Sequence, residues 1–135
     1  MKQYFRRVKG VAIEFNCPCC GKNEMNESFL GTLTDAREYC RTPFMINSGY
    51  RCEKHNKKVG GKVGDKAKGI QASTHTVGAA ADIHCTESRQ RALILCGLLE
   101  AGFSRIGIAK TFIHVDMADR LEGDDKKAEA VFWLY

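Results

Sequence analysis

The sequence predicts a small domain of mixed helices and strands, of the α+β or α/β class. Helical and extended signals alternate along its 135 residues, with no internal repeat and no low-complexity segment. The length suits one hydrophobic core, and a composition of 44% hydrophobic and 27% charged residues is ordinary for a globular protein. We therefore expect one domain over residues 1–135, in which residues 1–25 can form a cysteine-rich N-terminal extension.

Three helices are predicted from apolar spacing and from residues that begin or end helices. Asn26 is a suitable N-cap for the first helix, which must end before Pro43. The segment "CEKHNKKVGG" predicts a short second helix that its two final glycines end. The third helix is expected from Glu87 to Ala101, with Thr86 as its N-cap. Its apolar residues are expected to form a wide buried face: Leu93, Leu95, Cys96, Leu98 and Leu99.

Extended segments account for most of the remaining chain. The segment "FMINSGYR" reads as a short strand that runs into a turn at Gly49, and "AVFWLY" at the C-terminus reads as a last strand. Three further strands are expected at Thr76–Cys85, Phe103–Ile108 and Thr111–Met117. A polar, glycine-rich loop from Gly60 to Ser73 precedes the first of these three.

Two of the expected strands carry histidine and aspartate among small and β-branched residues. Side chains alternate along a strand, so Thr76–Cys85 would place Ala81 and Ile83 in the core and Asp82 on the opposite face. In the second strand the residues expected to face the core are Ile113, Val115 and Met117, and those on the opposite face are Phe112, His114 and Asp116. His75 directly precedes the first strand. We therefore expect His75, Asp82 and His114 to lie together.

Two imidazoles and one carboxylate form a recurrent ligand set for catalytic zinc, which keeps a fourth position for water. Each residue also has a purely structural interpretation: His75 in a loop, Asp82 capping a turn, and His114 as a hydrogen-bonded core histidine. Their joint occurrence favours the zinc site. His84 and His55 are expected to be structural or exposed.

The N-terminal sequence, the cysteine count and the net charge indicate the compartment and the kind of partner of the protein. The N-terminal "MKQYFRRVKGVAIEF" has no apolar core and no cleavage site of a signal peptide, so we expect synthesis without export. An odd number of cysteines, seven, favours free thiols in a reducing compartment. No segment has the roughly 18 apolar residues of a membrane span. The net charge of +5 suits an acidic partner, such as bacterial cell wall, nucleic acid or an anionic membrane.

The segment "CPCCGK" has a separate interpretation. Its thiols, Cys17, Cys19 and Cys20, are followed by a glycine, as in zinc knuckles. No second Cys-x-x-Cys pair follows downstream to complete a four-ligand site. If these residues bind a second, structural metal, Cys40 or Cys52 would be the missing ligand. Otherwise the downstream cysteines are expected to pack as small apolar side chains: Cys40, Cys52, Cys85 and Cys96.

Four ordered segments resemble a known family, the zinc D-Ala-D-Ala metallopeptidases of cell-wall metabolism, which include phage endolysins and D,D-carboxypeptidases of the Hedgehog-type fold. The segments are "SGYR" at Ser48–Arg51, "HNKKVGG" at His55–Gly61, "STHTVGAAAD" at Ser73–Asp82 and "FIHVD" at Phe112–Asp116. The family pattern Ser-x-His-x-x-Gly-x-Ala-x-Asp is met at every fixed position. The resemblance covers about Phe29 to Asp116.

The resemblance implies an α+β domain with an antiparallel sheet flanked by helices, and one zinc ion held by His75, Asp82 and His114. It also implies metal-assisted amide hydrolysis, with Arg51 stabilising charge on the substrate carbonyl. Better-known members have an acidic residue three positions before the last histidine ligand, where this chain has Thr111. Asp116 is then expected either to act as the general base or to orient the His114 imidazole.

Three functions remain open at this stage. The first is a zinc peptidase, a D,D-carboxypeptidase or endopeptidase such as a phage or prophage endolysin, that cuts peptidoglycan stem peptides or cross-links. It would act as a monomer on the cell wall after release, without a nucleic-acid or membrane partner. Which peptidoglycan bond it cuts is not specified by the motifs. The second is a non-catalytic zinc-binding module of the same fold, consistent with Thr111. The third is a basic nucleic-acid protein built on the cysteine cluster, which leaves the His75, Asp82 and His114 pattern unexplained.

Overall fold

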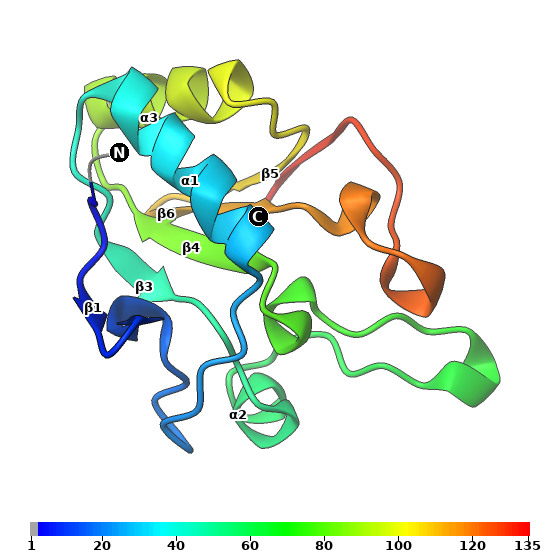
Figure 1. Cartoon of the computed structure of the whole chain (residues 1–135). Helices are drawn as coiled ribbons and strands as arrows, with labels where there is room; N and C mark the ends of the chain where they lie inside the picture. The colour runs from blue at the N-terminus through cyan, green and yellow to red at the C-terminus, as the bar shows by residue number, and fades with distance from the viewer. Residues whose placement is uncertain (1–2) are drawn as a thin grey trace.

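The computed structural model describes residues 3–135, so residues 1 and 2 of the expected N-terminal extension lie outside the described part. Helices α1 (Glu27–Cys40) and α3 (Ser88–Glu100) pack together on one side of a five-stranded sheet, and α2 (Glu53–Lys58) lies on the other side (Figure 1). The strands of this sheet are β3 (Ile46–Ser48), β4 (Ala80–His84), β5 (Arg105–Ile108), β6 (Phe112–Asp116) and β7 (Val131–Leu134).

The sheet has the order β3-β4-β6-β5-β7 and is antiparallel except where β7 pairs with β5. The α+β class with a mostly antiparallel sheet is therefore confirmed. A separate two-stranded hairpin, β1 (Arg7–Val8) and β2 (Val11–Ala12), precedes α1. Phe5 and Phe15 flank this hairpin in the chain and pack edge to face in the core, with ring centroids 5.1 Å apart. The N-terminal segment thus contributes to the hydrophobic core.

Helix α1 begins where its cap was predicted. The side chain of Asn26 accepts a hydrogen bond from the backbone N–H of Phe29 at 2.9 Å, which satisfies one of the free donors of the first turn. The helix ends at Arg41, which adopts a left-handed conformation with φ of 56° two residues before Pro43. Its buried side chains face the sheet: Phe29, Leu30, Leu33, Ala36 and Cys40.

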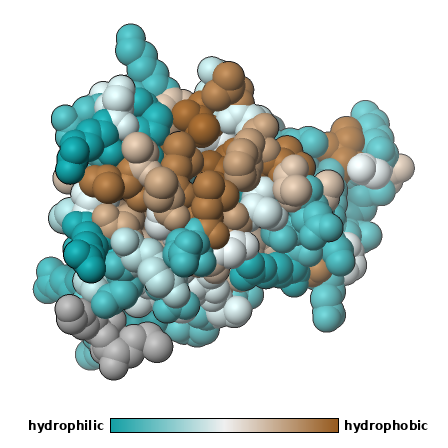
Figure 2. Space-filling view, turned by 90° about the horizontal axis from the view of Figure 1, so that it is seen from above, coloured by the Kyte–Doolittle hydropathy of each residue, from teal (hydrophilic) through white to brown (hydrophobic). Residues whose placement is uncertain are grey.

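Helix α3 differs from the prediction in its cap and in its buried face. It begins at Ser88 with Glu87 at the N-cap position and no capping side chain, so the predicted Thr86 cap is wrong. Its buried residues are Ile94, Gly97 and Leu98, whereas Cys96 is exposed and Leu99 is 48% exposed. Helix α3 packs mainly against α1, so the side of α3 that faces away from α1 and the core stays exposed. Figure 2 shows apolar side chains gathered on the same side of the molecule.

Close packing of the two long helices depends on Gly97. A side chain at this position would meet Cβ of Cys40 at 2.5 Å and the carbonyl oxygen of Ala36 at 2.6 Å, so the helices approach as closely as their backbones allow. Within residues 3–135, no helix is long and apolar enough to cross a membrane.

Strand β4 is shorter than predicted, and this matters for the site. The chain forms a 3-10 helix at Thr74–Val77, turns at Gly78 with φ of 72°, and becomes a strand only at Ala80. From there side chains alternate as expected. Ile83 of β4 and Ile113 and Val115 of β6 are fully buried against the long helices. The opposite face of the same strands carries polar side chains.

Candidate metal centre

His75, Asp82 and His114 converge on the face of the sheet opposite α1 and α3. Asp82 on β4 is the direct cross-strand partner of His114 on β6, and His75 reaches them from the 3-10 helix at Thr74–Val77. One ligand atom from each residue lies within 4.8 Å of the other two. All three residues are buried, with exposed fractions of 2%, 8% and 7%. The structure thus brings the sequence-predicted set together.

Each imidazole is oriented by an acceptor on its outer side. Nδ1 of His75 lies 2.7 Å from the carbonyl oxygen of Gly49, and Nε2 of His114 lies 2.8 Å from Oδ2 of Asp116. A carbonyl and an ionised carboxylate only accept hydrogen bonds, so these outer nitrogens carry the protons. The inner nitrogens of both rings then point at Asp82. Nε2 of His75 is 3.2 Å from its Oδ1, and Nδ1 of His114 is 2.9 Å from the same oxygen.

The chemistry of these inner atoms fits a metal ion. Once the outer nitrogens hold the protons, Nε2 of His75 and Oδ1 of Asp82 are both acceptors, and two acceptors at this distance need a cation between them. Two neutral imidazoles and one carboxylate are also the donor set that catalytic zinc takes. The outer hydrogen bonds match those that orient metal-bound histidines in general.

Electrostatics keeps the carboxylate ionised and His75 neutral. Burial on its own would raise the pKa of Asp82, but its hydrogen bonds with His114 and His75 outweigh burial and hold that pKa well below its usual range. Burial lowers the pKa of His75. For His114 burial acts in the same direction, yet hydrogen bonds with Asp116 and Asp82 outweigh it and raise the pKa. In the absence of a metal, His114 is therefore the member of the set that takes up a second proton, on Nδ1.

Arg51 fixes the second oxygen of Asp82. Its guanidinium donates to Oδ2 of Asp82 at 3.0 Å and to Oγ of Ser48 at 2.9 Å, and the backbone N–H of Arg51 donates to the carbonyl of His75 at 3.1 Å. The side chain is 14% exposed. Arg51 is thus held within the site in an ion pair with one of the three clustered residues, and it leaves Oδ1 of Asp82 free for the two imidazoles.

Asp116 lies behind His114, and both of its oxygens have partners. Oδ2 contacts His114, whereas Oδ1 accepts hydrogen bonds from Nε of Arg105 at 2.7 Å and from the backbone N–H of Ala118 at 3.0 Å. Burial would raise the pKa of this carboxyl, but the hydrogen bond and charge of His114 outweigh burial and lower it. Thr111, three positions before His114, is exposed just before β6.

Comparison with known families agrees with this geometry. A family model described as Peptidase M15 matches residues 9–116, which is most of the chain. The chain belongs to this family. M15 peptidases are zinc-dependent D-Ala-D-Ala peptidases, and the His75, Asp82 and His114 cluster fits the zinc site of such an enzyme. A comparison with curated proteins finds no match.

The M15 site opens into a cleft of about 430 Å³ that includes residues not predicted from the sequence. The new members are Arg105, Lys127, Trp133 and Tyr135. Trp133 reaches His114 because Gly107, between them in the sheet, has no side chain: a Cβ there would meet Trp133 Nε1 at 2.5 Å. The ring centroids of Trp133 and His114 are 5.3 Å apart. The sequence predicted a last strand at "AVFWLY", which β7 confirms, but it did not predict that Trp133 lies beside His114.

Charge in the cleft of this M15 peptidase is predominantly positive. Its lining has four cationic side chains, Arg51, Lys62, Arg105 and Lys127, and two carboxylates, Asp82 and Asp116. Lys127 is half-buried, donates to the carbonyl oxygen of Ala72 at 2.9 Å, and has a pKa lowered by burial. The cleft therefore favours a negatively charged group on a ligand.

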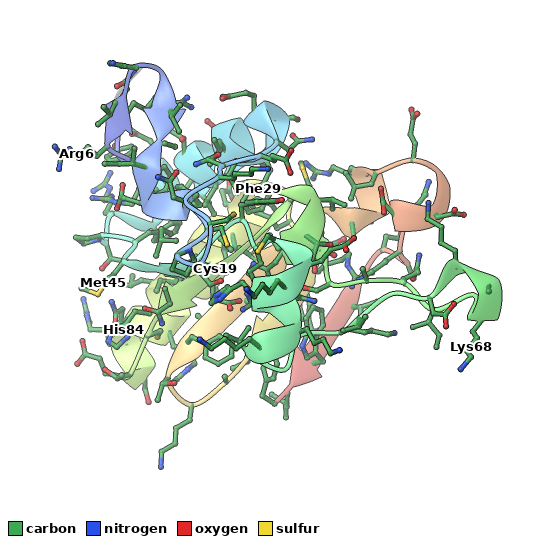
Figure 3. All side chains as sticks on the ribbon, turned by 90° about the horizontal axis from the view of Figure 1, so that it is seen from below. Arg6, Cys19, Phe29, Met45, Lys68 and His84 are labelled. Atoms are coloured by element: carbon green, nitrogen blue, oxygen red, sulfur yellow. The ribbon has the colours of Figure 1, made fainter. Side chains whose placement is uncertain are left out.

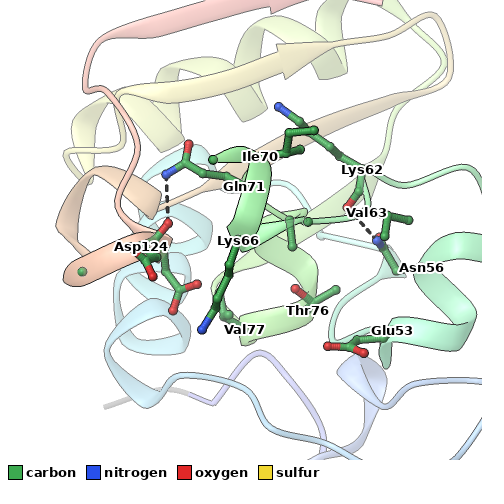
Figure 4. Close-up of a pocket in the computed structure, with 15 residues that line it drawn as sticks. Glu53, Asn56, Lys62, Val63, Lys66, Ile70, Gln71, Thr76, Val77 and Asp124 are labelled. Atoms are coloured by element: carbon green, nitrogen blue, oxygen red, sulfur yellow. Dashed lines mark hydrogen bonds between the residues drawn. The ribbon is translucent and has the colours of Figure 1, made fainter.

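A second, larger cleft of about 610 Å³ adjoins the first at Lys62. Glu53 and Asn56 of α2 line one side, and Asp124 and Gln71 line the other, where Nε2 of Gln71 donates to the carbonyl oxygen of Asp124 at 3.0 Å (Figure 4). It contains no histidine and no cysteine, so of these two clefts only the smaller one contains the His75, Asp82 and His114 cluster.

Proposed function

We propose that this M15 peptidase is a zinc enzyme that hydrolyses peptide bonds in peptidoglycan stem peptides or their cross-links. The observation that carries the proposal is the convergence of His75, Asp82 and His114, each of which offers one ligand atom within 4.8 Å of the other two. These atoms would hold the zinc. When bound in such a site, zinc polarises a carbonyl and activates water for attack on an amide.

The chain's own residues would orient the ligands and bind the substrate. Asp116 would act on His114 as a positioning residue, because both of its oxygens already have hydrogen-bond partners. Arg51 would keep Asp82 in place and present its remaining guanidinium surface to a carbonyl or carboxylate oxygen. Lys127 and Arg105 add positive charge to the cleft.

A peptidoglycan peptide suits this cleft for two reasons. Stem peptides end in, and carry along their length, free carboxylates, which match the excess of cationic side chains around the site. They are also extended, and the two adjoining clefts that share Lys62 offer an elongated path over the surface. Removal of a terminal D-alanine and cleavage within a cross-link are both compatible with this path.

The engagement of both cleft carboxylates favours a second candidate, a non-catalytic zinc-binding module that binds cell wall or a protein partner. Asp82 is held by Arg51 and the two histidines, and Asp116 is held by His114, Arg105 and Ala118. No other carboxylate lines this cleft among residues 3–135. Such a module would bind zinc and wall peptides without turnover.

One experiment separates the two candidates. Zinc-loaded protein is incubated with purified peptidoglycan, and the released fragments are identified by mass spectrometry. A peptidase releases D-alanine or shortened stem peptides, and His114→Ala abolishes the release. His84→Ala is the matched control, because this half-exposed histidine of β4 does not line the cleft. Zinc-loaded protein that sediments with the wall but releases nothing would establish the binding module.

A further inference from the structure

A second group of potential metal ligands lies away from the peptidase site. The sulfur atoms of Cys17, Cys20 and Cys52 all lie within 4.8 Å of one another. Cys17 and Cys20 belong to the segment before α1, whereas Cys52 directly precedes α2, so the cluster joins segments more than thirty residues apart. Figure 3 shows Cys19 of the same segment beside α2. Cys19 lies between Cys17 and Cys20 in the chain, and its thiol is exposed.

The local backbone holds Cys17 and Cys20 on the same side of a tight turn. The backbone N–H of Gly21 donates to the carbonyl oxygen of Cys17 at 2.8 Å, and that of Cys17 donates to the carbonyl oxygen of Lys22 at 2.8 Å. Gly21 has φ of 73°, a conformation that glycine adopts without strain. The pattern Cys-x-x-Cys-Gly therefore has a structural basis: it directs two thiols toward one point.

Backbone N–H groups point at two of the three sulfur atoms. The N–H of Cys52 donates to Sγ of Cys17 at 3.4 Å, and the N–H of His55 donates to Sγ of Cys52 at 3.4 Å. Donors of this kind stabilise the negative charge of a thiolate, which is the form that binds metal. Cys17 is fully buried, so its sulfur has the protein environment of a structural site and not of a surface thiol.

From these contacts we propose that Cys17, Cys20 and Cys52 bind a structural zinc ion, with Cys19 as the fourth ligand. Structural zinc takes tetrahedral sets of three or four cysteines with Zn–S distances of about 2.3 Å, which separate the sulfur atoms by about 3.8 Å. The three sulfur atoms, all within 4.8 Å of one another, lie close to that spacing. A disulfide would use two of the thiols and leave the third beside it unused, whereas a metal uses all three.

The proposed ion would tie the N-terminal segment to the peptidase site. Cys52 follows Arg51 in the chain, and the backbone N–H of Arg51 donates to the carbonyl of the metal-site residue His75. On the other side, the N–H of Tyr50 donates to the carbonyl oxygen of Phe15 at 2.9 Å. Zinc bound by the cysteines would therefore fix the chain directly after Arg51, at Cys52, while the Tyr50–Phe15 hydrogen bond fixes it directly before Arg51. The ion would also stabilise the fold, as structural zinc does.

The test is the zinc content of the full chain, purified under reducing conditions, supplied with zinc and freed of excess metal. We expect about two zinc ions per chain, because each site holds one. Cys52→Ser should retain about one zinc ion.

The Cys52→Ser substitution is suited to this test because Cys52 is the N-cap of α2, and serine can keep the cap while it removes the thiolate. Cys20→Ser, at an exposed position, should have the same effect. Cys96→Ser, an exposed thiol on α3, is the matched control and should keep both ions.

Cobalt identifies the ligands directly. Cobalt bound by several thiolates shows intense thiolate-to-metal charge-transfer absorption, which should be present in the parent and in His114→Ala and absent in Cys52→Ser. Cys19→Ser should lose zinc to a chelator about tenfold faster than the parent, since it removes one of four ligands. A loss rate equal to that of the parent would refute the assignment of Cys19.

The proposed peptidase site and this second site fail independently. A parent protein with one zinc ion that is lost in His114→Ala and kept in Cys52→Ser would overturn the cysteine site and leave the peptidase proposal intact. A parent protein with one zinc ion that is lost in Cys52→Ser and kept in His114→Ala would overturn the peptidase site and leave the cysteine site intact. A disulfide between any two of Cys17, Cys20 and Cys52 in the protein purified under these conditions would also overturn the cysteine site.

Discussion

Oδ2 of Asp116 lies 2.8 Å from Nε2 of His114, on the side of the ring that faces away from Asp82. A carboxylate in this position fixes both the rotation of the imidazole and the nitrogen that carries its proton. It also places Arg105 in the same chain of contacts, since Nε of Arg105 donates to the other oxygen of Asp116 at 2.7 Å. The orientation of His114 thus depends on a charged pair buried beneath it.

Asp116→Asn is expected to lower peptide hydrolysis by about 10- to 100-fold while the zinc ion is retained, the usual effect of losing a carboxylate that orients a metal-bound histidine. The rate on wall peptides and the zinc content are measured on the same preparation. Thr111→Ala, at an exposed position before β6, should leave the rate near that of the parent. Hydrolysis by Asp116→Asn at the parent rate would show that this contact has no part in the reaction.

Zinc affinity is expected to increase with pH. Hydrogen bonds with Asp116 and Asp82 raise the pKa of His114, so below that raised pKa zinc must displace a proton from Nδ1. Apparent affinity should therefore rise about tenfold per pH unit above the ordinary histidine pKa of about 6.5 and level off once the pH passes the raised value. His75, whose pKa burial lowers, is already neutral in this range.

The measurement for this pH dependence is competition with a chelator whose own protonation is known. Asp116→Asn removes the hydrogen bond that contributes to the raised pKa of His114, so its affinity should level off at lower pH than that of the parent. An affinity that does not change with pH above about 6.5 would mean that His114 holds no proton to displace.

Gly49→Ala is expected to lower the free energy of unfolding by about 1–3 kcal/mol, the usual cost of overpacking. A Cβ at position 49 would meet Cα of Phe15 at 2.6 Å. The carbonyl oxygen of Gly49 itself accepts the hydrogen bond from His75. Urea unfolding measures the change. Gly31→Ala is the matched control: it lies in α1 with no atom within 4 Å of a new Cβ and should stabilise the helix by up to about 1 kcal/mol. Equal stability of Gly49→Ala and the parent would contradict the close approach of Phe15.

Fluorescence of Trp133 should report whether the peptidase site is filled. It is the only tryptophan of the chain, and its ring centroid lies 5.3 Å from that of His114. Cobalt at this site should therefore quench most of the emission by energy transfer. The quenching should disappear in His114→Ala and persist in Cys52→Ser, whose substitution leaves the His75, Asp82 and His114 set unchanged. Quenching that survives His114→Ala would place the cobalt elsewhere.

The sequence by itself determined the local features of the fold and the composition of the site. The two-residue period of a strand separated Asp82 from Ile83 and His114 from Ile113, and the structure has the same separation of faces. The Asn26 cap was likewise predicted because a cap depends on residues within one helical turn. These features follow from short-range geometry, which a single sequence contains.

Only the tertiary structure decided which distant segments meet. Asp82 pairs with Arg51, and Cys52, one of two candidates in the sequence, joins Cys17, whereas Cys40 packs between α1 and α3. Trp133 reaches His114 only because β7 pairs in parallel with β5 and Gly107 leaves room. The apolar period of α3 could not show that Leu99 stays exposed, because periodicity defines a face of a helix but not what covers it. Strand order, register and helix packing arise from contacts between residues far apart in the chain, and these contacts leave no local pattern in the sequence.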